Sequence, residues 1–227
     1  GCSTAYHLAK GGWITVLIER DILTSGTTWH AAGMVTQLGN TPQITKIRKN
    51  SIKFYKDLKN ITGLDTSFRR TGTINIATTK SRYQEYLRQL TTSKLFDLNI
   101  DLINKKKFKD LYPIAKNKDV YGGLYIPEDG QADPEILTKV IADAAKKEGV
   151  KIFEKCKLQK ILKKENQIRG IKTNLGTINC EYIVLCAGMW SRQIGEAAGV
   201  SIPLYPNEHF YMITENFKNL PKVLPTF

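Results

Sequence analysis

The sequence has few cysteines and lacks any long apolar run. Its four cysteines are scattered over 227 residues, and none forms the C-x-x-C pair typical of zinc or redox sites. The spacing therefore predicts no metal site, and Cys180 and Cys186 are expected to be small buried residues on or beside strands. No apolar segment approaches the roughly 20 residues of a membrane span, so we predict no transmembrane helix.

Acidic residues are scarce relative to basic ones. The chain has 34 Lys and Arg against 21 Asp and Glu, a net charge of +13. Such a charge can indicate nucleic-acid binding. Here the basic residues are mostly lysines spread over predicted helix faces and turns, not arginine clusters interleaved with aromatic residues. We interpret them as a solvated surface with some attraction for anionic substrates, and predict no nucleic-acid partner.

An initiator methionine is absent as well. Gly1 is followed at once by helical sequence from Cys2 to Lys10, which Gly11-Gly12 ends. The nearly continuous apolar run 14–19 is typical of a buried parallel strand, and it ends at Glu19.

This order matches the second half of a dinucleotide-binding unit. There, a strand and G-x-G-x-x-G precede the helix, and an acidic residue about 20 positions further on binds the ribose. Gly1 fits the last glycine of that pattern and Glu19 the acidic residue. We expect the first strand and the two earlier glycines to be missing, so that the chain is a piece of a longer protein. A plain helix–strand connection is the alternative interpretation.

The next segment favours a flavin enzyme. Residues 24–33, Thr-Ser-Gly-Thr-Thr-Trp-His-Ala-Ala-Gly, place glycine, threonine and His30 directly beyond the predicted ribose-binding carboxylate. His30 has two interpretations at this point: a flavin ligand, or a loop histidine hydrogen-bonded to the protein.

The remaining pattern predicts two interleaved parts. The middle block has no dinucleotide signature, and alternates helices (43–58, 81–95, 107–112) with strands (73–78, 99–103, 121–126). Asp133-Pro134 then predicts a helix start, and Gly149 its end. A strand at 150–154, a meander at 157–163, 167–173 and 176–179, and a buried strand at 182–186 follow.

We therefore predict an α/β fold in which an FAD-binding Rossmann-like domain, incomplete and without its first strand, is interleaved with an α+β substrate domain. The predicted boundaries assign 1–44 and 131–200 to the FAD-binding domain. They assign 45–130 and the truncated segment 201–227 to the substrate domain.

A second histidine lies near the end of the chain. Tyr205-Pro206 predicts an extended entry, after which His209, Tyr211 and Ile213 would share one face of a strand. A His/Tyr pair in an ordinary sheet is the alternative to a catalytic role.

Three segments carry a family resemblance. Residues 18–34, 184–190 and 203–215 resemble, in order, the flavoprotein amine dehydrogenases that act on sarcosine and dimethylglycine, within the D-amino acid oxidase-like superfamily. Trp29-His-Ala-Ala-Gly33 is the most specific element. The resemblance spans the chain but covers only the N-terminal part of a family member.

The resemblance implies a cofactor site for FAD, bound covalently at His30 or non-covalently. Glu19 would bind the adenosine ribose, and Gly1 and Ser3 would lie near the pyrophosphate at a helix N-terminus. The full predicted set of cofactor-binding residues is Gly1, Ser3, Glu19, Arg20, Thr27, Thr28, His30, Ala32, Gly33, Leu158, Ala187, Gly188 and Trp190.

The resemblance also implies the reaction. A hydride would pass from the N-methyl carbon of dimethylglycine or sarcosine to FAD, with His209 and Tyr211 as catalytic residues. The departure from the family is Phe210, where glutamine is frequent. The carbon would leave as formaldehyde or pass to tetrahydrofolate bound in a C-terminal region outside this chain.

Several alternatives stay open. The electron acceptor would be an electron-transfer flavoprotein or oxygen, and the location the bacterial cytoplasm or the mitochondrial matrix. The fragment by itself is expected to be inactive. The rivals are another amine or amino-acid oxidoreductase of the superfamily, and a non-catalytic regulatory subunit that keeps the fold.

Overall fold

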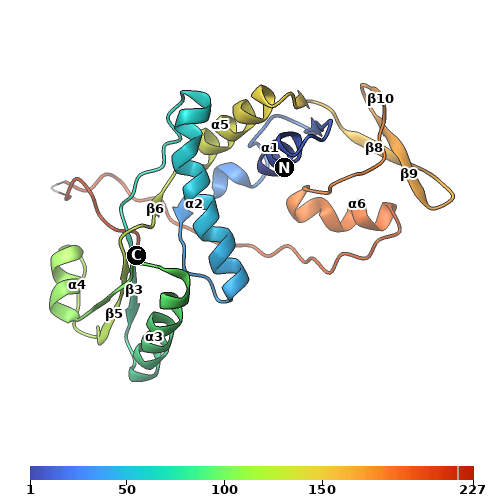
Figure 1. Ribbon diagram of the computed structural model, residues 1–227. Helices are drawn as coiled ribbons and strands as arrows, with labels where there is room; N and C mark the ends of the chain where they lie inside the picture. Colours follow the sequence, from blue (N-terminus) through green and yellow to red (C-terminus); the bar gives the residue numbers. More distant parts are fainter. Residues whose placement is uncertain (219) are drawn as a thin grey trace. The chain divides into compact units, whose positions relative to one another are not determined.

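The computed structural model describes residues 1–218 and 220–227 and divides the chain into two compact units. Unit 1 comprises 1–30 and 138–214, and unit 2 comprises 31–137 and 215–227. The mixed helices and strands confirm the predicted α/β fold class (Figure 1). The unit boundaries differ from the predicted ones at 44, 130 and 200, and the assignment of parts to flavin and substrate domains stays a prediction.

Unit 1 contains a pair of parallel strands, and each strand is preceded in the sequence by a helix. Strand β1 (Val16–Ile18) pairs in parallel with β7 (Lys151–Phe153), with Leu17 opposite Ile152. Helix α1 (Cys2–Lys10) precedes β1, ends at Gly11 and buries Cys2, Ala5 and Tyr6. Helix α5 (Pro134–Lys147) begins in unit 2, continues into unit 1 and leads into β7.

The ends of α5 follow the predicted signals. The Asp133 carboxylate accepts the backbone N–H groups of Glu135 and Ile136 at 2.8 and 3.0 Å, which satisfies two otherwise unpaired donors of the first turn. Gly149, at φ +89°, donates its N–H to the Lys146 carbonyl and ends the helix.

The predicted meander is present in unit 1. Strands β8 (Leu158–Lys164), β9 (Gln167–Thr173) and β10 (Gly176–Asn179) form an antiparallel sheet of order β10-β9-β8 (Figure 1). A 3-10 turn at Gly188–Trp190 and helix α6 (Ser191–Ala197) come later in the same unit.

Four expectations for unit 1 are wrong. Residues 182–186 are described but form no strand, and Tyr182 and Val184 are 71% and 57% exposed. Cys186 is exposed, not buried. Residues 207–214 likewise form no strand, and β1 is parallel as predicted but not buried. Apolar alternation predicts a strand only where a partner supplies the ladder, and neither segment pairs within the described chain.

Unit 2 is built on an antiparallel sheet. Strands β3 (Thr73–Ala77) and β4 (Asp101–Ile103) both pair with the central β5 (Gly122–Ile126). Helix α4 (Lys105–Leu111) buries Phe108 in a core with Ile74, Ile103 and Val120. The chain end returns to this sheet, because Thr226 exchanges backbone hydrogen bonds with Gly72 and Ile74.

The other helices of unit 2 are α2 (Pro42–Thr62) and α3 (Lys80–Ser93), with the 3-10 turn Lys94–Phe96 after α3. Thr41, Thr79 and Asn104 cap α2, α3 and α4 through side-chain oxygens that accept a backbone N–H. Helix α2 is longer than the predicted 43–58, since its stop is Gly63 in the left-handed conformation.

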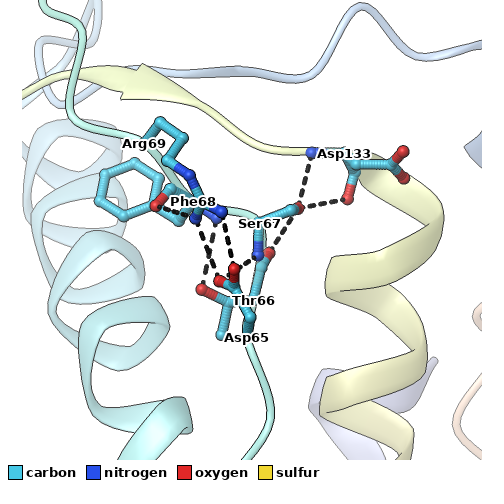
Figure 2. A network of polar contacts seen from close by, with 6 residues as sticks. All are labelled: Asp65, Thr66, Ser67, Phe68, Arg69 and Asp133. Carbon is cyan, nitrogen blue, oxygen red and sulfur yellow. Dashed lines mark hydrogen bonds and ion pairs between the residues drawn. The ribbon is translucent and has the colours of Figure 1, made fainter.

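A short antiparallel pair, β2 (Met34–Val35) with β6 (Gly130–Gln131), completes unit 2. Arg69 exchanges two backbone hydrogen bonds with Gln131 beside it. Figure 2 shows how the turn 65–69 is fixed: Arg69 forms two bonds with the Asp65 carboxylate, and Ser67 Oγ accepts the Asp133 N–H at 2.8 Å. The turn is thereby attached to the start of α5.

Candidate functional site

The carboxyl end of β1 holds Glu19 in a defined place. Its N–H donates to the Phe153 carbonyl at 2.8 Å, and its own carbonyl accepts the Cys156 N–H at 2.8 Å. The side-chain oxygen Oε1 accepts the Asp21 N–H at 2.9 Å. A carboxylate is therefore fixed at the carboxyl edge of parallel strands, where open α/β sheets bind ligands.

The N-terminus of α1 lies against the same strand. A Cβ built on Gly1 would lie 3.8 Å from both Leu17 Cδ1 and Cys186 Cβ, so this end of the helix approaches β1 and the segment before Ala187. Within the described chain no side chain caps α1, and its first turn, which includes the exposed Ser3, has no acidic residue. Such an end favours an anion through its backbone N–H groups and the helix dipole.

The turn 187–190 brings two of the predicted residues together. The Arg20 guanidinium lies over the Trp190 ring, 4.9 Å from its centroid, in cation–π geometry. Gly26 lies under the same ring, since a Cβ built there would be 3.5 Å from Trp190. Gly188 has φ +54° and no described atom within 4 Å of a built Cβ, so its backbone is open to a ligand. Gly26 belongs to the loop 24–33 that the sequence singled out, but it was not among the predicted cofactor-binding residues.

His30 ends the 3-10 turn Thr28–His30 and is held on two sides. Its ring centroid lies 3.5 Å from that of Trp29, with 32° between the planes. Its Nδ1 lies 3.3 Å from the hydroxyl of Tyr211, 181 residues further along. The structure therefore brings together the predicted flavin ligand and one predicted catalytic residue. His209 is an exposed neighbour of Tyr211 in the sequence, and its role stays a prediction.

The other predicted cofactor residues are scattered. Thr27 is exposed on the loop before His30, and Thr28 begins the 3-10 turn. Leu158 begins β8 opposite Thr173. Ala32 and Gly33 belong to unit 2. Their cofactor contacts stay predictions.

The backbone of unit 2 by itself requires a glycine at position 33. It adopts φ +72°, and a Cβ there would collide with the Ala132 carbonyl oxygen. The Ala132 N–H donates to the Gly33 carbonyl at 2.9 Å. The two backbones approach so closely that only glycine fits, irrespective of any cofactor.

A buried carboxylate near this pair was missed by the sequence reasoning. Asp129 is 0% exposed, and its Oδ1 accepts the Gln37 backbone N–H at 2.9 Å and the Gln37 Nε2–H at 3.4 Å. Its Oδ2 and the buried Thr73 Oγ1 have no hydrogen-bond partner among the described residues. Burial raises the pKa of Asp129 to about 6. The sequence shows only Pro127-Glu-Asp-Gly130, which is typical of an ordinary turn.

The described hollows lie elsewhere in unit 1. One of about 360 Å³ is lined by Arg192, Glu196 and residues 201–205 beside α6. Its lining includes neither Glu19 nor His30, so we do not place the candidate site there.

The residues of unit 1 fit a flavin dinucleotide by the chemistry of their groups. They offer a carboxylate for ribose hydroxyls at Glu19, an uncapped helix end for a pyrophosphate at Gly1, and an open backbone at Gly188. Fold and site together define a dinucleotide-binding α/β protein.

Comparison with known proteins gives the family. The chain matches the family "DAO: FAD dependent oxidoreductase" over residues 1–227, and it belongs to that family. This confirms the resemblance read from the sequence.

Over the regions that align, about a third of the chain's residues are identical to those of known relatives. It is 34% identical over 228 residues to 4-methylaminobutanoate oxidase (formaldehyde-forming) of Paenarthrobacter nicotinovorans, covering 100% of the chain and 28% of that protein. It is 35% identical to mitochondrial sarcosine dehydrogenase of Homo sapiens, covering 98% of the chain and 25% of the relative. The chain thus spans about a quarter of the length of these relatives.

Two further similarities bear on function. The mitochondrial pyruvate dehydrogenase phosphatase regulatory subunit of Mus musculus is 34% identical, covering 94% of the chain and 25% of that protein. Among solved structures, L-proline dehydrogenase from P. horikoshii superposes with a TM-score of 0.83 at 27% identity, covering 88% of this chain and 53% of that one.

The described residues contain neither a candidate membrane span nor a candidate metal cluster. None of their helices combines the length and apolar character needed to cross a membrane. No three of their His, Cys, Asp or Glu side chains gather where they could hold a metal ion.

Proposed function

We propose that the protein to which this chain belongs oxidises an N-methyl amine, such as sarcosine or dimethylglycine, with FAD as its cofactor. The observation that carries the proposal is the contact between His30 and Tyr211 in unit 1, the unit that also holds Glu19 at the carboxyl end of β1. Residues suited to the cofactor and to a polar substrate thus belong to one compact unit.

The cofactor would be held at both of its ends. Glu19 would accept hydrogen bonds from the ribose hydroxyls, and the first turn of α1 would bind the pyrophosphate through backbone N–H groups. His30 is the residue to which the isoalloxazine would be attached. The Gly188 backbone would contact the cofactor where a Cβ would otherwise stand.

The chemistry divides between cofactor and protein. Bound FAD supplies the acceptor for the hydride that leaves the N-methyl carbon. The amine must be neutral at that moment, so a neutral imidazole at His209 would accept the ammonium proton. Tyr211 was predicted to assist there, but its observed contact is with His30.

The test uses the protein expressed from its complete reading frame. Its flavin is expected to stay with the protein after acid precipitation, and to be released from His30→Ala. Sarcosine, dimethylglycine and 4-methylaminobutanoate are assayed beside L-proline and glycine. Flavin reduction by an N-methyl amine supports the proposal. Reduction only by L-proline or glycine would contradict it.

A regulatory subunit without catalysis is a second candidate, because one relative at 34% identity has that name. The two candidates predict different roles for His209, which is a general base only in an enzyme. If the protein is an enzyme, His209→Asn should lower kcat by about 10²–10⁴-fold, as for loss of a general base. A protein that binds flavin, and whose flavin no amine on the panel reduces, would favour the regulatory candidate.

The partners proposed for the enzyme are an electron-transfer flavoprotein or oxygen as electron acceptor. Reduced flavin that is reoxidised rapidly in air indicates oxygen; reduced flavin that persists in air until an electron-transfer flavoprotein is added indicates the latter. The location in bacterial cytoplasm or mitochondrial matrix and the use of tetrahydrofolate stay predictions.

A further inference from the structure

We propose that Tyr211 is a positioning residue for His30: its hydroxyl accepts the Nδ1–H of the imidazole and leaves the lone pair of Nε2 facing the flavin. The flavin rests on the proposed function above. The state of the His30 ring does not, and it can be measured in the chain itself.

The geometry that carries this is the fixing of one ring from two directions. Trp29 covers a face of the imidazole, with 3.5 Å between centroids. The Tyr211 hydroxyl lies at its edge, 3.3 Å from Nδ1. Trp29 occupies a face of the ring and Tyr211 its Nδ1 edge. Among the described contacts, Nε2 is therefore the ring nitrogen left for a further partner.

The chemistry of imidazole gives the contact its consequence. A neutral imidazole has one N–H and one lone pair, and the hydrogen bond at one nitrogen determines which form the other takes. Partners at the second nitrogen fix the tautomer and orientation of metal-ligating histidines in the same way. A tyrosine oxygen can accept from Nδ1–H, and the 58% exposure of Tyr211 lets its own proton bond to water.

The observed contact of Tyr211 also suggests a role different from that of His209. Both were predicted to face the substrate from one strand face, yet the segment 207–214 forms no strand in the structure. The Tyr211 hydroxyl is in contact with the predicted flavin ligand. We therefore assign the hydroxyl to His30, and leave the substrate proton to His209.

The direct test is nitrogen NMR of the imidazoles above their titration range. The chain has three histidines, so His7→Gln and His209→Gln assign the His30 signals. We expect His30 of the wild-type chain to be mainly the Nδ1–H tautomer. Tyr211→Phe should shift it to mainly Nε2–H, while Tyr205→Phe, an exposed tyrosine of the same segment, should leave it unchanged. A wild-type His30 already in the Nε2–H form would overturn the proposal, as would an unchanged Tyr211→Phe spectrum.

A second measurement links the ring to the cofactor. In the protein from the complete reading frame, Tyr211→Phe should slow the appearance of acid-stable flavin about tenfold, the low end of the effect of losing a partner that orients a ligand histidine. Unchanged incorporation would also contradict the role. If no variant or wild-type protein takes up flavin, the proposed function fails, whereas the tautomer result stands by itself.

Discussion

Two contacts in this molecule each join residues far apart in the sequence, and their surroundings are opposite. Asp129 reaches Gln37 across 92 positions, with no exposed surface on Asp129. His30 reaches Tyr211 across 181 positions, and both side chains are exposed. The first contact is between groups that water cannot replace. The second lies within reach of water and of a ligand.

The difference indicates what each contact is for. An unmet buried donor or acceptor costs about 1–3 kcal/mol, so the Asp129 contact contributes to the fold of unit 2. An exposed hydrogen bond contributes little to stability, but it can set which atom of a ring faces a ligand. Stability is therefore the measurement that fits Asp129, and the state of the imidazole is the one that fits His30.

The largest expected effect is that of Asp129→Ala. The change leaves the Gln37 N–H without its acceptor and opens a small void, so near pH 4, where the carboxyl is protonated in the folded protein, we expect a loss of about 2–4 kcal/mol in the free energy of unfolding. Urea denaturation measures it. Tyr211→Phe, measured in parallel, should lose less than about 0.5 kcal/mol, as exposed substitutions do. Equal losses would remove the distinction between the two contacts.

The pH dependence of stability sharpens the same comparison. Burial raises the pKa of Asp129 to about 6 from 3.8, against the weaker opposing effects of the Gln37 hydrogen bonds and the Arg48 charge. Because the folded pKa is the higher one, folding is favoured at low pH, and stability falls as pH rises from about 4 through about 6. A shift of two units corresponds to at most about 3 kcal/mol.

Asp129→Asn is the matched variant for this dependence. Its amide oxygen can still accept the Gln37 N–H, and the group does not ionise. We expect it to flatten the stability profile between pH 4 and pH 8, and to equal or exceed the wild type at pH 8. A variant profile that keeps the wild-type slope would show that another group titrates. The measurement is urea denaturation across that pH range.

A smaller effect is expected where the two chain segments of unit 2 meet at Gly33. Gly33→Ala should lose about 2 kcal/mol more than Gly63→Ala. Both glycines have positive φ, near +72° and +79°, but only Gly33 would drive a Cβ into a carbonyl oxygen, while the space beside Gly63 is open. Thermal unfolding of the two variants distinguishes the cost of the steric collision at Gly33 from the cost of positive φ, which both positions share. Equal losses would mean that φ alone decides.

The sequence predicted the local features of the fold better than the distant ones. Asp133-Pro134 and Gly149 set the ends of α5 through chemistry within a few residues, and both predictions are confirmed. Residues 182–186 have the same apolar character as a strand, but a strand also needs a partner, which no single segment reveals. The end of α2 is also a local feature: the helix continues past the predicted residue 58 and ends before Gly63.

The site follows the same rule. Glu19 was predicted to bind the ribose because a carboxylate after an apolar run is a local pattern; the structure places it at the carboxyl end of β1, and its role stays a prediction. The contact of His30 with Tyr211, and that of Asp129 with Gln37, depend on segments that only the fold brings together. Pro127-Glu-Asp-Gly130 carries no signal that its aspartate is buried.

The smallest expected effect is at the exposed pair Asp65–Arg69, which is the surface counterpart of Asp129 within unit 2. The hydrogen bonds from Arg69, and then that from the Ser67 N–H, lower the pKa of Asp65 to about 2. Because the folded pKa lies below 3.8, any stabilisation is present above about pH 4 and is lost as pH falls through about 2. Solvent screens both groups, so the loss should be small.

Two variants divide what Asp65 contributes. Asp65→Asn keeps an oxygen for the Ser67 N–H but removes the charge and the second oxygen, which accepts from Arg69, whereas Asp65→Ala removes every side-chain acceptor. Ser67 also bonds to Asp133 at the start of α5, so we expect Asp65→Ala to destabilise unit 2 more than Asp65→Asn (Figure 2). Glu85→Gln in α3, which breaks an exposed pair with Arg88 inside one helix, is the control. If Asp65→Ala were no worse than Glu85→Gln, the turn would hold without its carboxylate, and burial alone would distinguish the contacts that stabilise unit 2.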